Sequence, residues 1–122
     1  MTQRDPGVYL EDIERYAAAA VRFTSNYSLE QYLADEKTRA AVERVLEICG
    51  EAMNSLYKLA PEVAERIPNA RDIIGFRNIL AHGYAELDHN KVYDIAIKHA
   101  PALLSAVRNE LKAFPDPTAP AG

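Results

Sequence analysis

Residues 36–60 read EKTRAAVERVLEICGEAMNSLYKLA, and this stretch decides the fold class. Its apolar residues recur every three or four positions, which is the spacing of one face of an α-helix. Asp35 precedes the stretch as a capping residue, and Pro61 ends it. The pattern therefore predicts one long helix from Glu36 to Ala60. The apolar face consists of Val42, Val45, Leu46, Cys49, Met53, Leu56 and Ala60.

Helical patterns also occupy the sequence on both sides of this stretch. Apolar spacing predicts a first helix over residues 8–23, another over 69–82 and a last one over 89–114. Shorter helical turns are expected after Ser28, in a capping box with Gln31, and over 61–64. No segment alternates with a period of two for long enough to form a strand. We therefore predict an all-α fold, an up-down bundle of four main helices plus short helical turns.

Two residues interrupt the helical patterns. Gly50 lies inside the long helix and costs about 1 kcal/mol relative to alanine, so we expect another helix to approach closely there. Pro101 lies inside the last helix and has no N–H to donate, so we expect a kink or a break near it.

Composition narrows the class of protein. The chain has 122 residues, 48% hydrophobic, with 14 basic and 18 acidic side chains, a net charge of −4. One helical domain is expected over residues 1–114, followed by a proline-rich, irregular tail over 115–122. The acidic balance argues against tight, non-specific binding of nucleic acid. With Cys49 alone there is no disulfide within the chain, and no apolar run is long enough for a membrane span, so we expect a cytoplasmic protein.

The segment 77–84, RNILAHGY, carries the candidate chemistry. With Arg77 at zero and about 100° per residue, Asn78 falls near 100°, His82 near 140° and Tyr84 near −20°. The apolar residues fall between about 200° and 320°, an arc that we predict to face the core. The four polar residues are thus predicted to face away from it. The apolar arc consists of Ile73, Phe76, Ile79 and Leu80.

Arginine and histidine together suit the cleavage of phosphate esters. A guanidinium binds a phosphoryl group through paired, charge-assisted bonds and stabilises charge in the transition state. Histidine titrates near neutral pH and moves protons. RNA supplies its own 2′-hydroxyl nucleophile, so such a site needs no metal. From the residues alone a structural interpretation stays open, in which Arg77 pairs with a carboxylate and His82 stabilises a helix end.

The same segment resembles the R-x4-H-x-Y motif of HepT-like toxins, which belong to the HEPN superfamily of small helical ribonucleases. Residues 50–52, 73–76 and 87–88 also look like that family, and the resemblance covers roughly residues 8–114. It implies a homodimer in which the motif helices of both copies meet. It further implies RNA cleavage without a metal or other cofactor, through a 2′,3′-cyclic phosphate, with tRNA and mRNA as candidate substrates.

The resemblance also implies a role for each motif residue. Arg77 and His82 would be catalytic, with Asn78 in support and Glu51 lining the same cleft. Tyr84 would accept AMP from an MntA-like nucleotidyltransferase antitoxin, which silences the toxin. A second hypothesis remains from another class of function. The same helical protein would then be a non-catalytic subunit that binds a nucleotidyltransferase partner or a nucleotide.

Overall fold

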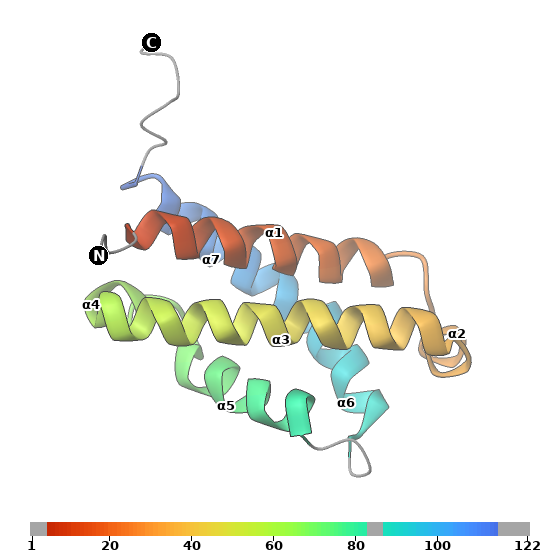
Figure 1. The fold of residues 1–122 in the computed structure, drawn as a ribbon. Helices are drawn as coiled ribbons and strands as arrows, with labels where there is room; N and C mark the ends of the chain where they lie inside the picture. Colours follow the sequence, from red (N-terminus) through yellow and green to blue (C-terminus); the bar gives the residue numbers. More distant parts are fainter. Residues whose placement is uncertain (1–4, 83–86, 115–122) are drawn as a thin grey trace.

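The computed structural model describes residues 5–82 and 87–114, and this part of the chain is helical without a strand, which confirms the all-α fold (Figure 1). None of its helices is long and apolar enough to cross a membrane. In chain order the elements are α1 (Pro6–Thr24), α2 (Leu29–Ala34), α3 (Glu36–Leu59), α4 (Pro61–Ala64), α5 (Ala70–His82), α6 (His89–Asp94), the π-helix η1 (Ile95–His99) and α7 (Ala100–Leu111).

Side-chain caps set the N-termini of several helices. Asp35 Oδ1 accepts a hydrogen bond of 3.1 Å from the backbone N–H of Thr38 and begins α3. Ser28 and Gln31 form the predicted capping box of α2, and Asp88 caps α6. Such caps satisfy N–H groups that have no partner inside the helix. The expected helix starts are therefore confirmed to within a residue or two.

The break expected near Pro101 takes the form of a π-helical turn. Residues 95–99 form η1, and the N–H of Ala100 donates to the carbonyl of Ile95, five residues earlier. The wider turn lies immediately before the proline, which has no N–H of its own to donate. The expected last helix is thus divided into α6, η1 and α7.

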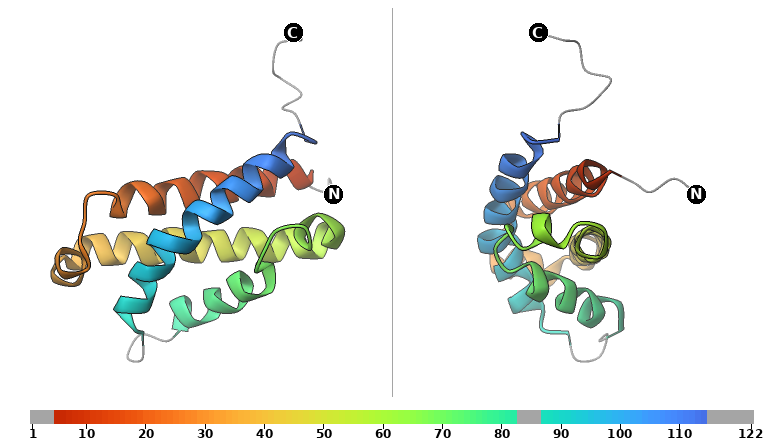
Figure 2. Two further views of the ribbon diagram at one scale, coloured as in Figure 1. Left: turned by 180° about the vertical axis from the view of Figure 1, so that it is seen from behind. Right: turned by 90° about the vertical axis from the view of Figure 1, so that its left-hand side faces the viewer.

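Helix α3 forms the centre of the bundle. Helix α1 packs along one side of it and α5 along another, while α7 crosses α1 (Figure 2). One buried cluster, around Leu10, Met53 and Val107, joins α1, α3 and α7. A second cluster, around Tyr32 and Val42, joins α2 and α3 to α1, α5 and α6. Helix α5 therefore depends on α3 for its placement.

Candidate functional site

Helix α5 contacts α3 at Gly50. A Cβ atom added at Gly50 would lie 2.6 Å from the Cβ of Arg77 and 3.0 Å from the carbonyl oxygen of Ile73. These separations are too short for any side chain larger than hydrogen. Gly50 therefore permits the close approach of a second helix, as predicted, and the residue it meets is the arginine of the motif.

The orientation of α5 corrects the predicted core arc. Ala70 and Leu80 are buried and Arg77 is half-buried against α3, whereas the side chain of Ile79 is 52% exposed. The buried arc is thus centred near Arg77, about 90° away from the predicted centre. Gly50 at the α3 contact allows this closer packing, and none of the described elements covers Ile79 fully. The expectation that Arg77 faces away from the core is wrong for the base of its side chain.

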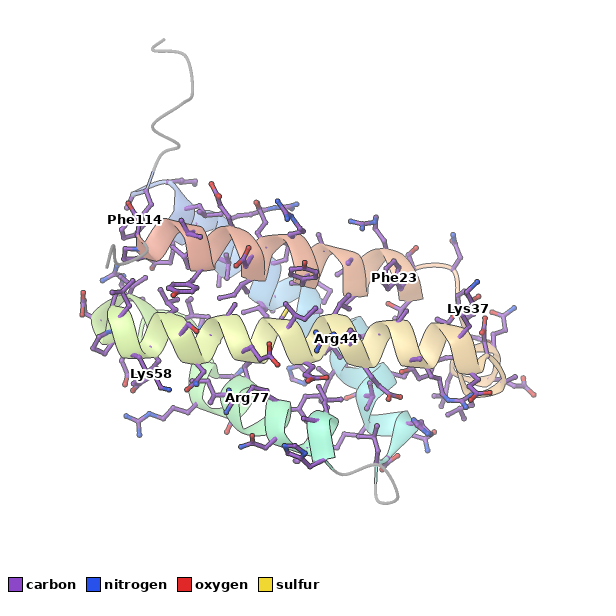
Figure 3. All side chains as sticks on the ribbon, viewed as in Figure 1. Phe23, Lys37, Arg44, Lys58, Arg77 and Phe114 are labelled. Carbon is purple, nitrogen blue, oxygen red and sulfur yellow. The ribbon has the colours of Figure 1, made fainter. Side chains whose placement is uncertain are left out.

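The guanidinium of Arg77 nevertheless remains available to a ligand. Its Nη2 lies 3.4 Å from Asn78 Oδ1, to which it donates a weak hydrogen bond. No carboxylate among the residues described here forms an ion pair with it, and Figure 3 shows it on α5 next to α3. Within residues 5–82 and 87–114 its positive charge is therefore not compensated by a carboxylate in direct contact. Four other arginines do pair with carboxylates, namely Arg44, Arg66, Arg71 and Arg108.

The other predicted site residues are spread over α5 and α3. Asn78 and His82 are exposed on α5, and His82 is its last residue. His82 lies about 140° around the helix from Arg77 and about 7.5 Å further along its axis. Glu51 is exposed on α3 beside Gly50, and no hydrogen bond or ion pair joins it to Arg77 in the described structure. Tyr84 lies outside the described residues.

A groove of about 850 Å³ lies between α5 and the α6–η1–α7 segment. Its lining is mostly apolar and includes Ile73, Phe76, Ile79, Ile95 and Leu103. The sequence did not indicate this groove. The apolar residues of α5 predict that this face is buried, but they do not show which element covers it. The structure leaves part of the predicted core face of α5 open instead.

Other reactive groups contribute less to a site. Burial raises the pKa of the Cys49 thiol to about 12, so it remains a protonated thiol at neutral pH. His89 Nδ1 lies 3.4 Å from Glu43 Oε2 of α3. Within residues 5–82 and 87–114, no three His, Cys, Asp or Glu side chains converge as metal ligands. The chemistry of the described surface is therefore concentrated on α5.

Comparison with known proteins finds one ribonuclease family that covers most of the chain. A family model described as "Ribonuclease HepT-like" matches residues 10–110. A protein of Methanocaldococcus jannaschii named "Putative RNase MJ1380" is 30% identical over 109 residues, which cover 88% of this chain and 97% of the relative. A protein of Thermococcus cleftensis named "Probable ribonuclease HepT" is 33% identical over 99 residues, 78% of this chain and 86% of the relative.

Proposed function

We propose that this chain, which belongs to the HepT-like ribonuclease family, is a toxin that cleaves RNA through Arg77 and His82 in a homodimer. The family assignment confirms the resemblance carried by residues 77–84 and the ribonuclease class. The observation that carries the proposed site is the guanidinium of Arg77, which forms no ion pair with a described carboxylate and lies on the same helix as an exposed histidine.

Arg77 stabilises the charge on the reacting phosphate. The Cβ and Cγ of Arg77 lie against Gly50, which places the base of the side chain while the guanidinium extends beyond the helix contact. A guanidinium with no carboxylate partner binds a phosphodiester through two parallel, charge-assisted hydrogen bonds. Asn78 contacts this guanidinium through its Oδ1 and orients it.

His82 moves the proton in the reaction. Its neutral imidazole accepts the proton of the ribose 2′-hydroxyl, whose oxygen attacks the neighbouring phosphorus. The bond from phosphorus to the 5′-oxygen breaks, and that oxygen takes a proton from a His82 imidazolium, which returns the histidine to its neutral form. The products are a 2′,3′-cyclic phosphate and a 5′-hydroxyl, and no oxidant or external nucleophile takes part.

A second copy of the chain completes the site. On one copy Arg77 and His82 point about 140° apart, so the two side chains of a single copy do not converge on one phosphate. The exposed Ile79 provides an apolar residue on the motif helix for contact with a second copy. Such a contact removes apolar area from water and brings both motif helices together.

Transfer of AMP to Tyr84 switches the enzyme off. The tyrosine oxygen attacks the α-phosphate of ATP on a nucleotidyltransferase antitoxin, and pyrophosphate leaves. Tyr84 follows His82 by two residues in the sequence, so the attached nucleotide reaches the catalytic groups. Its phosphate competes with RNA for Arg77, and its bulk blocks the approach of the substrate.

The decisive experiment is cleavage of labelled RNA by the purified protein in the presence of EDTA. We expect a 2′,3′-cyclic phosphate product, with kcat about 10²–10³-fold lower for Arg77→Ala and about 10²–10⁴-fold lower for His82→Ala. A variant that cleaves RNA as fast as the wild type would contradict the proposed site. If the wild type binds RNA or the nucleotidyltransferase but does not cleave RNA, a non-catalytic binding subunit is favoured.

The modification site has a separate test. A Tyr84→Phe protein that its partner still silences by AMP transfer would contradict the assigned modification site.

A further inference from the structure

We propose that Arg71 forms a second phosphate subsite on α5, which binds the RNA strand away from the reacting phosphate. This inference rests on the proposed function, because it extends the same site along the same helix. The residues that carry it are Arg71, the two side chains that hold it, and the open surface at Gly75.

Arg71 lies on the same flank of α5 as Asn78 and His82. With Arg77 at zero, Arg71 falls near 120° around the helix, between Asn78 near 100° and His82 near 140°. All three of these flank residues are exposed. Arg71 lies about 10 Å from Asn78 along the helix axis and about 16 Å from His82. The three side chains therefore form a row along one exposed flank, which we call the α5 flank.

Gly75 leaves the middle of this row open. It falls near 160° on the same wheel, and a Cβ atom added there would meet nothing within 4 Å. The backbone at Gly75, which lies in the groove beside α5 together with Arg71, is therefore open to a strand lying along the helix. A sugar–phosphate backbone approaches a glycine more closely than any other residue.

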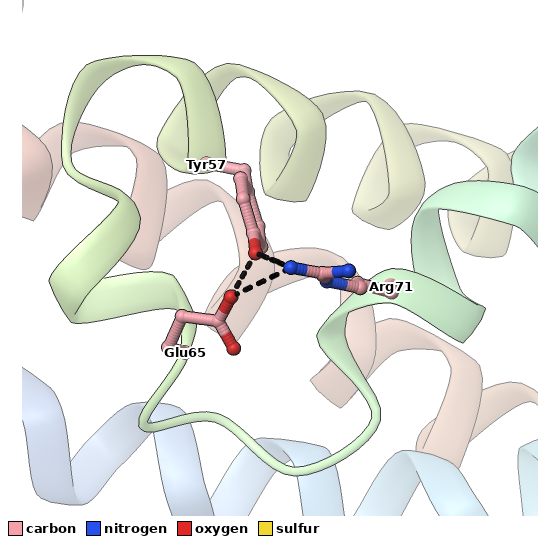
Figure 4. A network of polar contacts seen from close by, with 3 residues as sticks. All are labelled: Tyr57, Glu65 and Arg71. Atoms are coloured by element: carbon pink, nitrogen blue, oxygen red, sulfur yellow. Dashed lines mark hydrogen bonds and ion pairs between the residues drawn. The ribbon is translucent and has the colours of Figure 1, made fainter.

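Hydrogen bonds hold the Arg71 guanidinium in one orientation (Figure 4). Its Nε and Nη2 donate to the hydroxyl of Tyr57 at 3.1 and 2.8 Å, and Nη2 also donates to Glu65 Oε1 at 3.2 Å. The guanidinium carbon lies 5.6 Å from the centre of the Tyr57 ring. The Tyr57 hydroxyl in turn donates to Glu65. No described residue bonds to Nη1, so its two N–H groups remain free for a phosphate.

This network orients Arg71 more than it stabilises the fold. The side chains of Arg71 and Glu65 are 79% and 55% exposed, and ion pairs as exposed as this contribute little to folding. Hydrogen bonds from Tyr57 and Arg71 lower the pKa of Glu65, so its carboxylate stays ionised and keeps its hold on Nη2. Glu65 and Asp72, which follows Arg71 in the sequence, also reduce the positive charge around the Arg71 guanidinium. The subsite therefore guides the strand and adds modest affinity.

The test compares Arg71→Ala with Arg108→Ala in the full-length protein. Arg108 is a matched control, because it is also exposed and paired with a carboxylate, Glu14, but lies where α7 meets α1. For single-stranded RNA we expect Arg71→Ala to raise KM several-fold with kcat unchanged. The slope of log Kd against log salt concentration should fall by about 0.7, the value for one lost phosphate contact. Arg108→Ala should change neither quantity.

Tyr57→Phe provides a second variant that leaves the charge unchanged. It keeps the ring beside Arg71 and removes the hydroxyl that orients the guanidinium, so KM should rise by less than in Arg71→Ala. Equal KM values and salt slopes for Arg71→Ala and Arg108→Ala would overturn the subsite. If cleavage is still lost in Arg77→Ala, that result contradicts only the subsite. If Arg77→Ala cleaves RNA as fast as the wild type, the proposed function itself is contradicted.

Discussion

The Cβ of Arg77 occupies the space that a side chain at Gly50 would fill, since a Cβ built at Gly50 lies 2.6 Å from it. This contact fixes the rotation of α5 on α3. It places the base of Arg77 at the helix interface, while Asn78 and His82 remain exposed. The geometry of the proposed site therefore depends on a glycine of another helix.

Gly50→Ala should destabilise the protein and reduce its activity. Alanine gains about 1 kcal/mol in helix propensity, but overpacking against Arg77 and Ile73 costs about 1–3 kcal/mol. We expect a net loss of up to about 2 kcal/mol in the free energy of unfolding, measured by urea denaturation at fixed protein concentration. RNA cleavage should fall as well, because α5 must move away from α3.

Gly75→Ala is the matched control for this prediction, since no atom lies within 4 Å of its added Cβ. It should stabilise the fold by up to about 1 kcal/mol, the helix-propensity difference. Destabilisation by Gly75→Ala, or equal stability changes in the two variants, would contradict the packing role of Gly50.

Ile79→Glu should dissociate the proposed homodimer with little effect on the folded monomer. The side chain is 52% exposed, so its replacement should change the stability of one copy by about 0.5 kcal/mol or less. A carboxylate at this position would be buried without a partner in the dimer. Sedimentation should show a monomer, and cleavage should be lost. Leu33→Glu, at a position on α2 that is 38% exposed, should remain dimeric. If Ile79→Glu and Leu33→Glu are both dimeric, the interface lies elsewhere.

Arg77→Lys should restore only part of the activity lost in Arg77→Ala. Lysine keeps the positive charge but lacks the planar fork that binds two phosphate oxygens at once. We expect kcat to lie between the values of the wild type and the alanine variant, with the circular dichroism spectrum unchanged. Full activity in the lysine variant would show that charge alone is sufficient and that paired hydrogen bonding has no role.

Tyr27→Phe should reduce stability at neutral pH and have less effect in acid. The Tyr27 hydroxyl donates to Asp35 Oδ2 at 2.7 Å, and this bond, with those from Thr38, lowers the pKa of Asp35 from its ordinary value. A lowered pKa means that the stabilisation is present above the unfolded value and is lost as pH falls through the folded value. Urea midpoints for the two proteins should converge in acid. A constant difference between them at all pH values would exclude this linkage.

Local chemistry in the sequence was sufficient to predict the elements of this protein. Asp35, Ser28 and Asp88 lie where helices begin, because their side chains accept hydrogen bonds from N–H groups in the first turn. Pro61 marks the end of the longest helix. The motif in residues 77–84 indicated the family, because its residue types and spacing are visible without any structure.

Only the tertiary structure decided how α5 is rotated on α3. A helical wheel gives the angles between residues of one helix, whereas the direction of the core depends on the partner surface. Gly50 allowed Arg77 to lie inward and left Ile79 exposed, the reverse of what side-chain polarity predicts. The sequence alone also determined that Arg71 shares a flank with Asn78 and His82, through its spacing. That Tyr57 and Glu65 hold its guanidinium depends on residues of α3 and of the segment after α4, which only folding brings together.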